Sequence, residues 1–234
     1  MTPLYIIPAR GGSKGIPRKN IKPLCGRPLI AYTIDVALAA QKVTGGYILL
    51  STDDAEIASV ARQYGLKTDY MRPADLGGDA VGSREVMLDA MDWATSKGIS
   101  FDCVVLLQPT SPLRTLADVL NAEEKYSSEI DMVVSVCASD ANPYYNLFEL
   151  KDDGLLVVSK GNGLLKRRQD APPVYEYNGA VYVVNPQSLR EVPLGAFPRR
   201  IPCLMPRERS LDLDTPLDWE MAEYRIKNID KAEK

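Results

Sequence analysis

Short apolar runs alternate with longer amphipathic stretches along the first 138 residues, and this alternation limits the fold more than any other feature of the sequence. The apolar runs predict strands, and the stretches between them have helical periodicity bounded by capping residues and glycines. This order predicts an α/β fold with a mostly parallel sheet, helices on both faces and right-handed crossovers. Strands are expected at 4–7, 47–51, 67–71, 103–107 and 132–136, and helices at 29–40, 54–64, 83–97 and 115–126.

Beyond residue 138 the alternation stops. The segments 147–150 and 155–158 flank a turn-forming Asp-Asp-Gly sequence and predict a β-hairpin. Residues 139–178 are too short for a separate domain and are expected to form an inserted hairpin, either a flap or an arm that serves in dimer formation and contributes to the sugar site. A single domain over residues 1–234 is completed by strands at 180–185 and 201–204 and by a closing helix at 215–229 with Pro216 in its first turn.

Composition excludes several kinds of chemistry. The chain has no histidine, which rules out a Ser/His/Asp triad, a Cys/His dyad and every His-ligated metal site. Its four cysteines lie far apart without a CxxC pair, so we expect buried thiols rather than a zinc site or a disulfide framework. The net charge of −3 gives no general nucleic-acid footprint, and we find no signal peptide and no apolar run long enough for a membrane span. We therefore expect a cytoplasmic protein that binds neither nucleic acid nor membrane.

A glycine-rich basic loop follows the first expected strand. Within residues 8–20 it contains Arg10, Lys14, Arg18 and Lys19, in a chain that is net acidic. Open parallel sheets bind ligands at the carboxyl ends of their strands, glycines let backbone N–H groups approach phosphate oxygens, and cations neutralise the phosphate charge. The loop matches neither GxxxxGK[ST] nor GxGxxG. It predicts a phosphate-binding loop, with a mobile, solvated basic turn as the alternative.

Two other polar segments are placed to share a site with this loop. Residues 108–114 follow the strand expected at 103–107, and their polar side chains suit a polyhydroxylated ligand; a turn that caps the next helix is the alternative. Asp212 and Asp214 lie two residues apart on an extended segment, so their carboxylates point to one face with Cα atoms about 6.5–7 Å apart. Such a pair can bind Mg²⁺ together with substrate phosphates, or Asp214 can simply cap the final helix.

The run from Ile7 to Asn20, IPARGGSKGIPRKN, resembles the signature of the acylneuraminate (CMP-sialic acid) cytidylyltransferases. The resemblance implies a Rossmann-like nucleotidyltransferase fold, a homodimer, and a loop that wraps the triphosphate of CTP. Arg10 and Lys19 fall on the family's phosphate-binding cations. The nucleotide-binding residues implied in this loop are Ala9, Arg10, Gly11, Gly12, Ser13, Lys19 and Asn20.

The same resemblance covers the segment at 108–114 and the aspartate pair. The sequence QPTSPLR resembles the family motif whose glutamine contacts the sugar. Asp212 and Asp214 fall on the family's metal-binding pair, which implies Mg²⁺ as the cofactor. The sugar-binding residues implied here are Gln108, Thr110 and Ser111.

Two further segments resemble the family less closely. Arg72 and Ser83 fall in a stretch similar to the one that cradles cytosine, and an ordinary loop before a capped helix is the alternative. The RRQ sequence at 167–169 and the later Asn-Gly-Ala sequence resemble a sugar-binding stretch, which makes Arg168 a candidate for the sugar carboxylate and Asn178 a sugar-binding amide. A basic rim of the dimer interface is the alternative for that stretch.

These residues and the resemblance predict a cytidylyltransferase that transfers CMP from CTP to a sialic-acid-like nonulosonic acid. The anomeric hydroxyl of the sugar would attack the α-phosphorus in line and release pyrophosphate, chemistry that consists mainly of positioning and charge stabilisation. Arg10, Lys14 and Lys19 are expected to stabilise the pyrophosphate. Since no histidine is available, Asp214 or a metal-bound hydroxide is the expected base, and Mg²⁺ would bridge phosphate oxygens.

The sequence leaves the acceptor open. Some sialic acid enzymes of the family have a lysine in the segment corresponding to 142–147, and this chain has none there. N-acetylneuraminate, deaminated neuraminate, legionaminate and pseudaminate are all candidates. A 3-deoxy-octulosonate cytidylyltransferase or another sugar nucleotidyltransferase is the enzymatic alternative, and a catalytically silent nucleotide-binding protein that regulates a partner is the non-enzymatic one.

Overall fold

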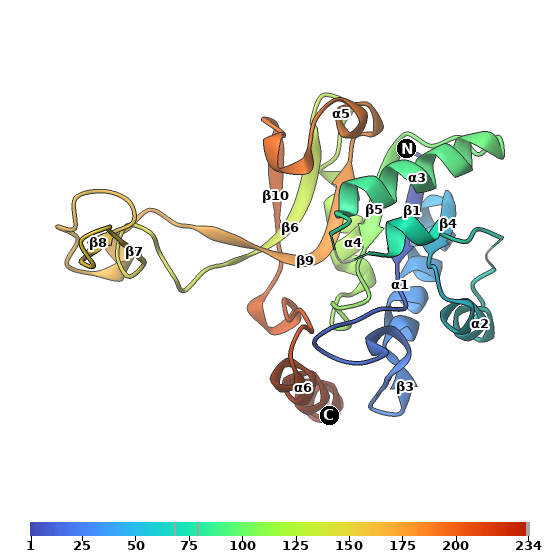
Figure 1. Cartoon of the computed structure of the whole chain (residues 1–234), viewed down its shortest axis with the longest axis horizontal. Coiled ribbons are helices and arrows are strands. Elements are labelled where there is room, and N and C mark those ends of the chain that lie inside the picture. The colour runs from blue at the N-terminus through green and yellow to red at the C-terminus, as the bar shows by residue number, and fades with distance from the viewer. Residues whose placement is uncertain (68, 79, 233–234) are drawn as a thin grey trace.

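A central sheet organises the computed structural model, which describes residues 1–67, 69–78 and 80–232 (Figure 1). Its strands follow the order β10–β6–β9–β5–β1–β4. β1 pairs in parallel with β4 and β5, β10 pairs in parallel with β6, and β9 runs antiparallel between β5 and β6. The mostly parallel α/β sheet expected from the sequence is therefore confirmed. The strands are β1 (Pro3–Pro8), β4 (Tyr47–Ser51), β5 (Cys103–Leu107), β6 (Met132–Ala138), β9 (Tyr175–Val184) and β10 (Arg200–Leu204).

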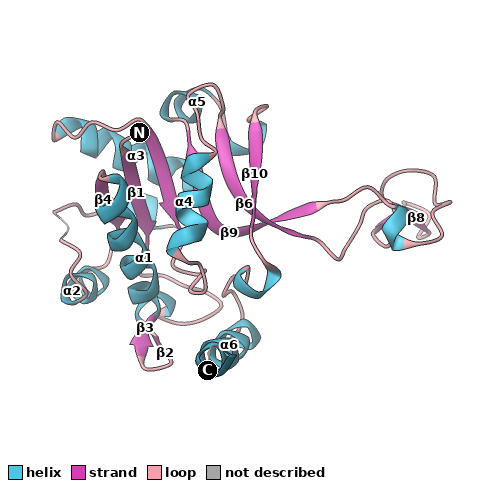
Figure 2. Cartoon of the chain, turned by 180° about the vertical axis from the view of Figure 1, so that it is seen from behind, coloured by secondary structure: helices cyan, strands magenta, loops and turns pink. Residues whose placement is uncertain are grey.

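Helices cover both faces of this sheet (Figures 1 and 2). Residues of β1 alternate between the two faces, as a strand buried on both sides requires. Tyr5 and Ile7 belong to a core cluster shared with α1, α2 and α4, whereas Leu4 and Ile6 belong to one shared with α3 and α5. The helices are α1 (Leu29–Thr44), α2 (Ala55–Gln63), α3 (Ser83–Ser96), α4 (Leu116–Glu124) and α5 (Pro186–Glu191).

A smaller apolar cluster fixes the C-terminal segment against the N-terminal loop. It joins α6 (Pro216–Ala232) to a two-stranded ribbon made of β2 (Pro23–Leu24) and β3 (Arg27–Pro28). Ile16 of the loop, Leu213 and Trp219 are buried together in this cluster. Residues near the two ends of the chain are thereby brought to the same place.

Side chains cap the first turns of α2 and α4: Thr115 was the expected cap of α4, whereas α2 is capped by Asp54 and not by Thr52 or Asp53, the caps that the sequence suggested. Asp54 accepts the backbone N–H groups of Glu56 and Ile57 at the start of α2. Thr115 and Asp118 form a reciprocal capping box at the start of α4. Such caps satisfy N–H groups that have no partner inside the helix.

The strand expected at 67–71 is wrong for the described residues of that range, which lie in a loop; Thr68 lies outside the described residues. β4 forms the edge of the sheet, and the chain beyond α2 touches it through one backbone hydrogen bond, from Arg72 N to the carbonyl of Thr52 (2.8 Å). Tyr70 is buried against α3 without pairing with a strand. Among the described residues of this segment, only Tyr70 is buried; Lys67, Asp69 and Met71 are exposed.

Residues 139–174 project away from the sheet as an arm (Figure 1). The predicted hairpin forms within it from β7 (Phe148–Leu150) and β8 (Leu156–Val158), which pair antiparallel. The chain returns to the sheet as β9, which starts at Tyr175 instead of the expected residue 180. Because β6 leads out to the arm and β9 leads back, β9 enters the sheet in the opposite direction.

Membrane spans and disulfides were not expected. Within residues 1–67, 69–78 and 80–232, no helix has the length and apolarity needed to cross a bilayer. Cys103, Cys137 and Cys203 are buried free thiols, and Cys25 is a half-buried one.

Candidate active site

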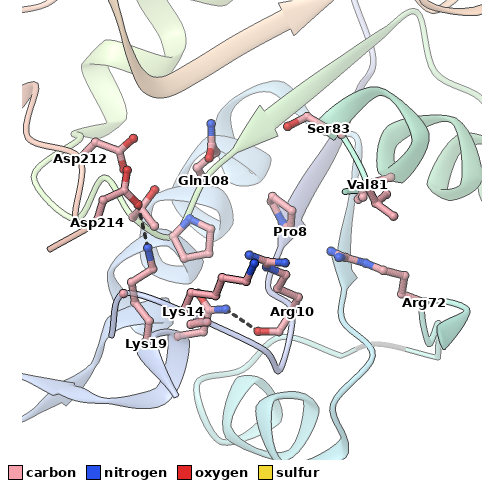
Figure 3. A pocket seen from close by; sticks show the side chains of 17 residues that line it. Pro8, Arg10, Lys14, Lys19, Arg72, Val81, Ser83, Gln108, Asp212 and Asp214 are labelled. Atoms are coloured by element: carbon pink, nitrogen blue, oxygen red, sulfur yellow. Dashed lines mark hydrogen bonds and ion pairs between the residues drawn. The ribbon is translucent and has the colours of Figure 1, made fainter. Parts of the chain in front are cut away.

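A cavity of about 390 Å³ opens at the carboxyl ends of β1 and β5. Figure 3 shows Asp212 and Asp214 on one side of it and Arg72 and Ser83 on the other. Five separate stretches of the chain meet there: the loop after β1, the loop after α2 at Arg72, the start of α3, the turn after β5 and the segment before α6. The lining residues are Pro8, Arg10, Ser13, Lys14, Gly15, Lys19, Asn20, Arg72, Val81, Gly82, Ser83, Val86, Gln108, Pro109, Thr110, Asp212 and Asp214.

The backbone of the loop after β1 is held in shape by hydrogen bonds with neighbouring residues. Asp53 accepts the N–H of Gly11 (2.8 Å), and the buried side chain of Asn20 donates to the carbonyl of Arg10 (2.9 Å). Ala9 donates its N–H to the carbonyl of Ser51 at the end of β4 (2.8 Å). The contacts of Gly11 and Ala9 tie the backbone of the loop to the end of β4 and to the residues that follow β4.

This arrangement divides the predicted nucleotide-binding residues into two groups. Arg10, Ser13, Lys19 and Asn20 line the cavity, and Lys14 lines it with them. Ala9 is buried in the core, and neither it nor the pair Gly11 and Gly12 is among the lining residues. The N–H groups of Ala9 and Gly11 donate to Ser51 and Asp53, so for these two the structure indicates a role in the shape of the loop; a phosphate contact through Gly12 stays a prediction.

Acidic residues at the start of α2, which sequence reasoning missed, anchor the base of the loop. Arg18 adopts a left-handed backbone conformation (φ 54°) and forms ion pairs with Asp54 and Glu56. The Arg18 guanidinium lowers the pKa of Asp54. The signal in the sequence was an acidic triplet (Asp53, Asp54 and Glu56) directly after the second strand, at the same sheet edge as the basic loop.

The basic loop is joined directly to the aspartate segment. Lys19 donates to the backbone carbonyl of Leu213 (2.7 Å) and forms an ion pair with Asp214 (3.1 Å), drawn as a dashed line in Figure 3. Gly15 lies so close to this segment that a Cβ atom on it would approach the carbonyl oxygen of Asp214 to 2.3 Å. Phosphate-binding and metal-binding candidates therefore form one connected unit.

Asp212 is the more buried of the two aspartates. Its Oδ1 atom has no hydrogen-bond partner in the described part of the chain. Burial, and then the neighbouring Asp214 carboxylate, raise the pKa of Asp212. Within residues 1–67, 69–78 and 80–232 no group of three or more acidic or thiol side chains is placed to hold a metal. The pair, with its unsatisfied oxygen, fits an ion that takes its remaining ligands from a bound nucleotide.

The turn after β5 contributes Gln108 and Thr110 to the cavity. The backbone of Thr110 accepts the N–H of Leu213 (3.0 Å), which ties this turn to the aspartate segment. Ser111, a predicted sugar-binding residue, is 1% exposed and does not line the cavity. Its hydroxyl lies beneath the turn, so the structure does not bring it to a ligand in this conformation.

Arg72 and Ser83 lie together at the opposite side of the cavity (Figure 3). Arg72 donates from Nε to the hydroxyl of Ser51 (2.9 Å) and from Nη2 to its carbonyl (2.6 Å), so its guanidinium is fixed to the end of β4. Burial lowers the pKa of Arg72. Ser83 is the first residue of α3, where backbone N–H groups without helical partners point out of the helix end.

A family model described as "cytidylyltransferase" matches residues 4–223, which includes every segment of this cavity. The chain belongs to the cytidylyltransferase family.

Curated relatives of this cytidylyltransferase match most of its length. It is 34% identical to the CMP-N,N'-diacetyllegionaminic acid synthase of Legionella pneumophila, over 94% of both chains. It is 33% identical to the pseudaminic acid cytidylyltransferase of Campylobacter jejuni, over 97% of both chains. An N-acylneuraminate cytidylyltransferase of Streptococcus agalactiae is 35% identical over 94% of this chain and 52% of the relative.

Solved structures with low sequence identity share its fold. A CMP:2-keto-3-deoxy-manno-octonic acid synthetase, solved with CTP, superposes with a TM-score of 0.69 at 17% identity, covering 98% of this chain and all of the other. A 4-diphosphocytidyl-2C-methyl-D-erythritol synthase from Anaerococcus prevotii gives 0.64 at 13% identity, covering 97% of this chain and 98% of the other. The Rossmann-like nucleotidyltransferase fold expected from the sequence is therefore shown.

Two predicted sugar-binding residues of the cytidylyltransferase lie outside the cavity. Asn178 is buried: its Oδ1 accepts from Ser135 (2.6 Å), and its Nδ2 donates to Ser210 (2.9 Å). Its amide is therefore occupied within the fold. Arg168 lies on the arm, where it forms an ion pair with Asp140 and lines a separate cavity of about 320 Å³.

Gly179, directly after Asn178, packs against two residues that line the cavity. It has a positive φ of 72°, and a Cβ atom on it would lie 3.0 Å from Oδ2 of Asp212 and 3.7 Å from Nε2 of Gln108. Both functional side chains therefore pack against its α-carbon. Glycine is required here for conformation and for space.

A second cavity of about 210 Å³ meets the first at Ser83. Its walls are mainly apolar and aromatic. Sequence reasoning missed it because its residues come from separate elements and follow the same apolar pattern as core residues. The other lining residues are Leu106, Met132, Tyr177, Tyr182, Leu194 and Gly195.

Proposed function

We propose that this cytidylyltransferase transfers CMP from CTP to the anomeric hydroxyl of a nonulosonic acid and releases pyrophosphate. One observation carries the proposal: a single cavity brings a cationic loop, a turn with amide and hydroxyl groups, and a pair of carboxylates to the same sheet edge. Relatives at 33–35% identity are named for legionaminic, pseudaminic and N-acylneuraminic acids. Since CTP is an intracellular metabolite, we place the reaction in the cytoplasm.

On this proposal the loop after β1 binds the triphosphate. Arg10 and Lys14 line the cavity, where their charges would stabilise the leaving pyrophosphate. Lys19, only 14% exposed at its side chain, would stabilise the same charge while holding Asp214 beside it. Asp214, 73% exposed, is the proposed base for the attacking hydroxyl.

Asp212 and Asp214 would hold Mg²⁺ together with phosphate oxygens of CTP. The unsatisfied oxygen of Asp212 and the oxygen-only donor set fit this ion. When bound, Mg²⁺ would supply charge neutralisation at the phosphates. Gln108 and Thr110 are proposed to orient the sugar from the turn after β5.

The second cavity gives the acceptor room for an apolar substituent. It adjoins the first at Ser83, and its aromatic walls suit an acyl or methyl group more than a bare polyol. N-Acetylneuraminate, legionaminate and pseudaminate carry such groups, whereas deaminated neuraminate and 3-deoxy-octulosonate carry hydroxyls in their place. This favours an acylated nonulosonic acid as the acceptor, without choosing among these three.

A reaction panel tests the proposal. Purified protein is mixed with CTP, Mg²⁺ and, separately, N-acetylneuraminate, deaminated neuraminate, legionaminate, pseudaminate and 3-deoxy-octulosonate, and pyrophosphate and the CMP-sugar are measured. We expect release with at least one nonulosonic acid, loss of release with EDTA, and no turnover by Asp214→Asn although CTP still binds. Turnover with octulosonate alone would support the alternative sugar, CTP binding without any turnover would support a regulatory protein, and normal turnover by Asp214→Asn would contradict its role.

We also propose that the protein acts as a homodimer through its arm. The hairpin of β7 and β8 exposes Leu150, Leu155 and Leu156 by 64–71%. An isolated two-stranded hairpin is marginally stable in water, and a partner that covers these leucines would stabilise it. A second copy is the proposed partner, and its cavity is where Arg168 of the arm would find a sugar carboxylate.

A further inference from the structure

Arg114, in the turn between β5 and α4, is buried and forms no ion pair with a carboxylate of residues 1–67, 69–78 or 80–232. It is 3% exposed. The nearby Asp118 is already engaged by Arg209 (2.7 Å) and by the cap of α4 at Thr115. Burial lowers the pKa of the Arg114 guanidinium to about 9. An unpaired buried cation costs stability, so its retention points to a specific task.

The guanidinium instead donates to groups from three parts of the fold. Nη1 donates to the carbonyls of Ala180 (2.6 Å) and Gln108 (3.1 Å), and Nη2 donates to the hydroxyl of Thr33 on α1 (2.7 Å). Thr33 in turn donates to the carbonyl of Gln108 (3.4 Å). The nitrogen Nε has no partner in the described part of the chain. The planar group therefore clamps β9 and the turn after β5 to each other and to α1.

Of the two clamped residues, Gln108 projects its side chain into the cavity, and Ala180 directly follows Gly179 in the sequence. The α-carbon of Gly179 packs against the Asp212 carboxylate and the Gln108 amide, since a Cβ atom on this glycine would lie only 3.0 and 3.7 Å from them. A change in the separation of these two backbone segments would therefore move Gln108 relative to Asp212.

We propose that Arg114 is a positioning residue, which sets the distance between Gln108 and Asp212 by holding the carbonyls of Gln108 and Ala180 without touching substrate. The proposal rests on the function proposed above. A lysine at this position keeps a positive charge, but its single ammonium cannot reach three acceptors in the fork geometry of a guanidinium. Arg114→Lys is therefore the informative substitution.

Steady-state kinetics with the best acceptor of the panel provide the first test. We expect Arg114→Lys to lower kcat/KM for the sugar acid by about tenfold to a hundredfold, the range for a small misplacement of reacting groups, with the affinity for CTP unchanged. Thr33→Val, which removes one contact of the clamp and keeps the side-chain shape, is expected to cause a smaller loss of the same kind. Because both changes act on one clamp, their effects should not add in the double variant.

A matched control separates positioning from general stability. Arg199 pairs with the buried Asp131 and lines neither cavity, so Arg199→Lys should lower the melting temperature and leave the kinetic constants unchanged. Equal kcat/KM for the wild type and Arg114→Lys would overturn the proposal. So would additive losses of kcat/KM in the double variant, or a loss of CTP affinity as large as the loss of kcat/KM for the sugar acid. If Arg114→Lys does not fold, Thr33→Val alone carries the kinetic test.

Crystal structures of the wild type and of Arg114→Lys give a readout that does not depend on turnover. We expect Gln108 to be displaced relative to Asp212 in the variant. Unchanged positions of these two side chains would overturn the proposal even if no acid of the panel were a substrate. Failure of wild-type turnover with every acid would instead contradict the proposed function.

Discussion

Gly15 and Gly179 place their α-carbons against the two aspartates of the cavity. A Cβ atom on Gly15 would come within 2.3 Å of the Asp214 carbonyl oxygen, and one on Gly179 would come within 3.0 Å of the Asp212 carboxylate. Backbone oxygens cannot move aside as the end of a flexible side chain can. The closeness of the basic loop to the aspartate segment therefore depends on the absence of a side chain at residue 15.

Gly15→Ala is expected to separate this loop from Asp214 and to lower kcat/KM by about a hundredfold or more, since small displacements of reacting groups have effects of that size. The readout is pyrophosphate release from CTP and the acceptor. Gly12→Ala is the matched comparison, because a Cβ atom there meets nothing within 4 Å. A loss at Gly12→Ala as large as that at Gly15→Ala would show that loop flexibility, rather than close packing, is what matters.

At the scale of elements, Asp131 connects β6, α5 and β10 through its carboxylate. Directly before β6, it accepts from Ser188 of α5 (2.7 Å) and from the backbone N–H of Arg199 (2.8 Å) and its side chain (2.7 Å) just before β10. The Arg199 hydrogen bond, opposed by burial, lowers the pKa of Asp131 to about 2. The ionised carboxylate is therefore favoured by folding.

Because the pKa of Asp131 is lowered by folding, the free energy of unfolding should depend on pH in a known direction. A carboxyl whose pKa is lower in the folded state contributes stability above its unfolded pKa of 3.8 and loses it as the pH falls toward about 2. Asp131→Asn should reduce the free energy of unfolding at pH 7 by about 1–3 kcal/mol, a typical value for hydrogen bonds to a charged group. In thermal or urea unfolding at several pH values, the difference from wild type should shrink from about pH 4 to about pH 2.

Asp92→Asn is the control for Asp131→Asn. Asp92 also pairs with an arginine, Arg190, but both side chains are exposed, and exposed pairs contribute little. A difference at Asp131→Asn that stays constant down to pH 2 would contradict the ionic origin of this contact.

At the scale of the whole molecule, the arm exposes apolar side chains that no other part of the described chain covers. Residues 139–174 extend from the sheet in Figure 1, with large apolar side chains in water. The two strands that lead to and from the arm, β6 and β9, are central in the sheet, so movement of the arm would be transmitted to the cavity edge near Gly179. We therefore expect assembly and activity to be linked.

Leu156→Glu tests the proposed homodimer. Leu156 is 69% exposed on the arm of a single chain. A charge at this position would lose its solvation in a dimer interface, which costs free energy. We therefore expect sedimentation velocity to show a dimeric wild type and a monomeric variant. Leu217→Glu on α6, where leucine is 64% exposed, is the matched control and should leave the dimer intact. A monomeric wild type, or a Leu156→Glu protein that stays dimeric, would contradict the role of the arm.

The sequence by itself determined most strands and helices, the parallel sheet and the segments that meet at its edge. These features depend on local patterns, such as the apolar run 103–107 and the cap at Thr115, that a chain shows without its tertiary contacts. The segment 67–71 was an exception, because a loop that buries one aromatic side chain, Tyr70, has a local sequence similar to that of a short strand.

Only the tertiary structure decided which residues face the cavity and which hold it together. Asn178 and Ser111 carry groups suited to a sugar, yet the fold buries both. Lys19 and Asp214, 195 residues apart, were assigned to different ligands but form one ion pair. The clamp at Arg114 likewise joins residues distant in sequence. Such contacts depend on how separate elements pack, and the periodicity of a single segment carries no information about them.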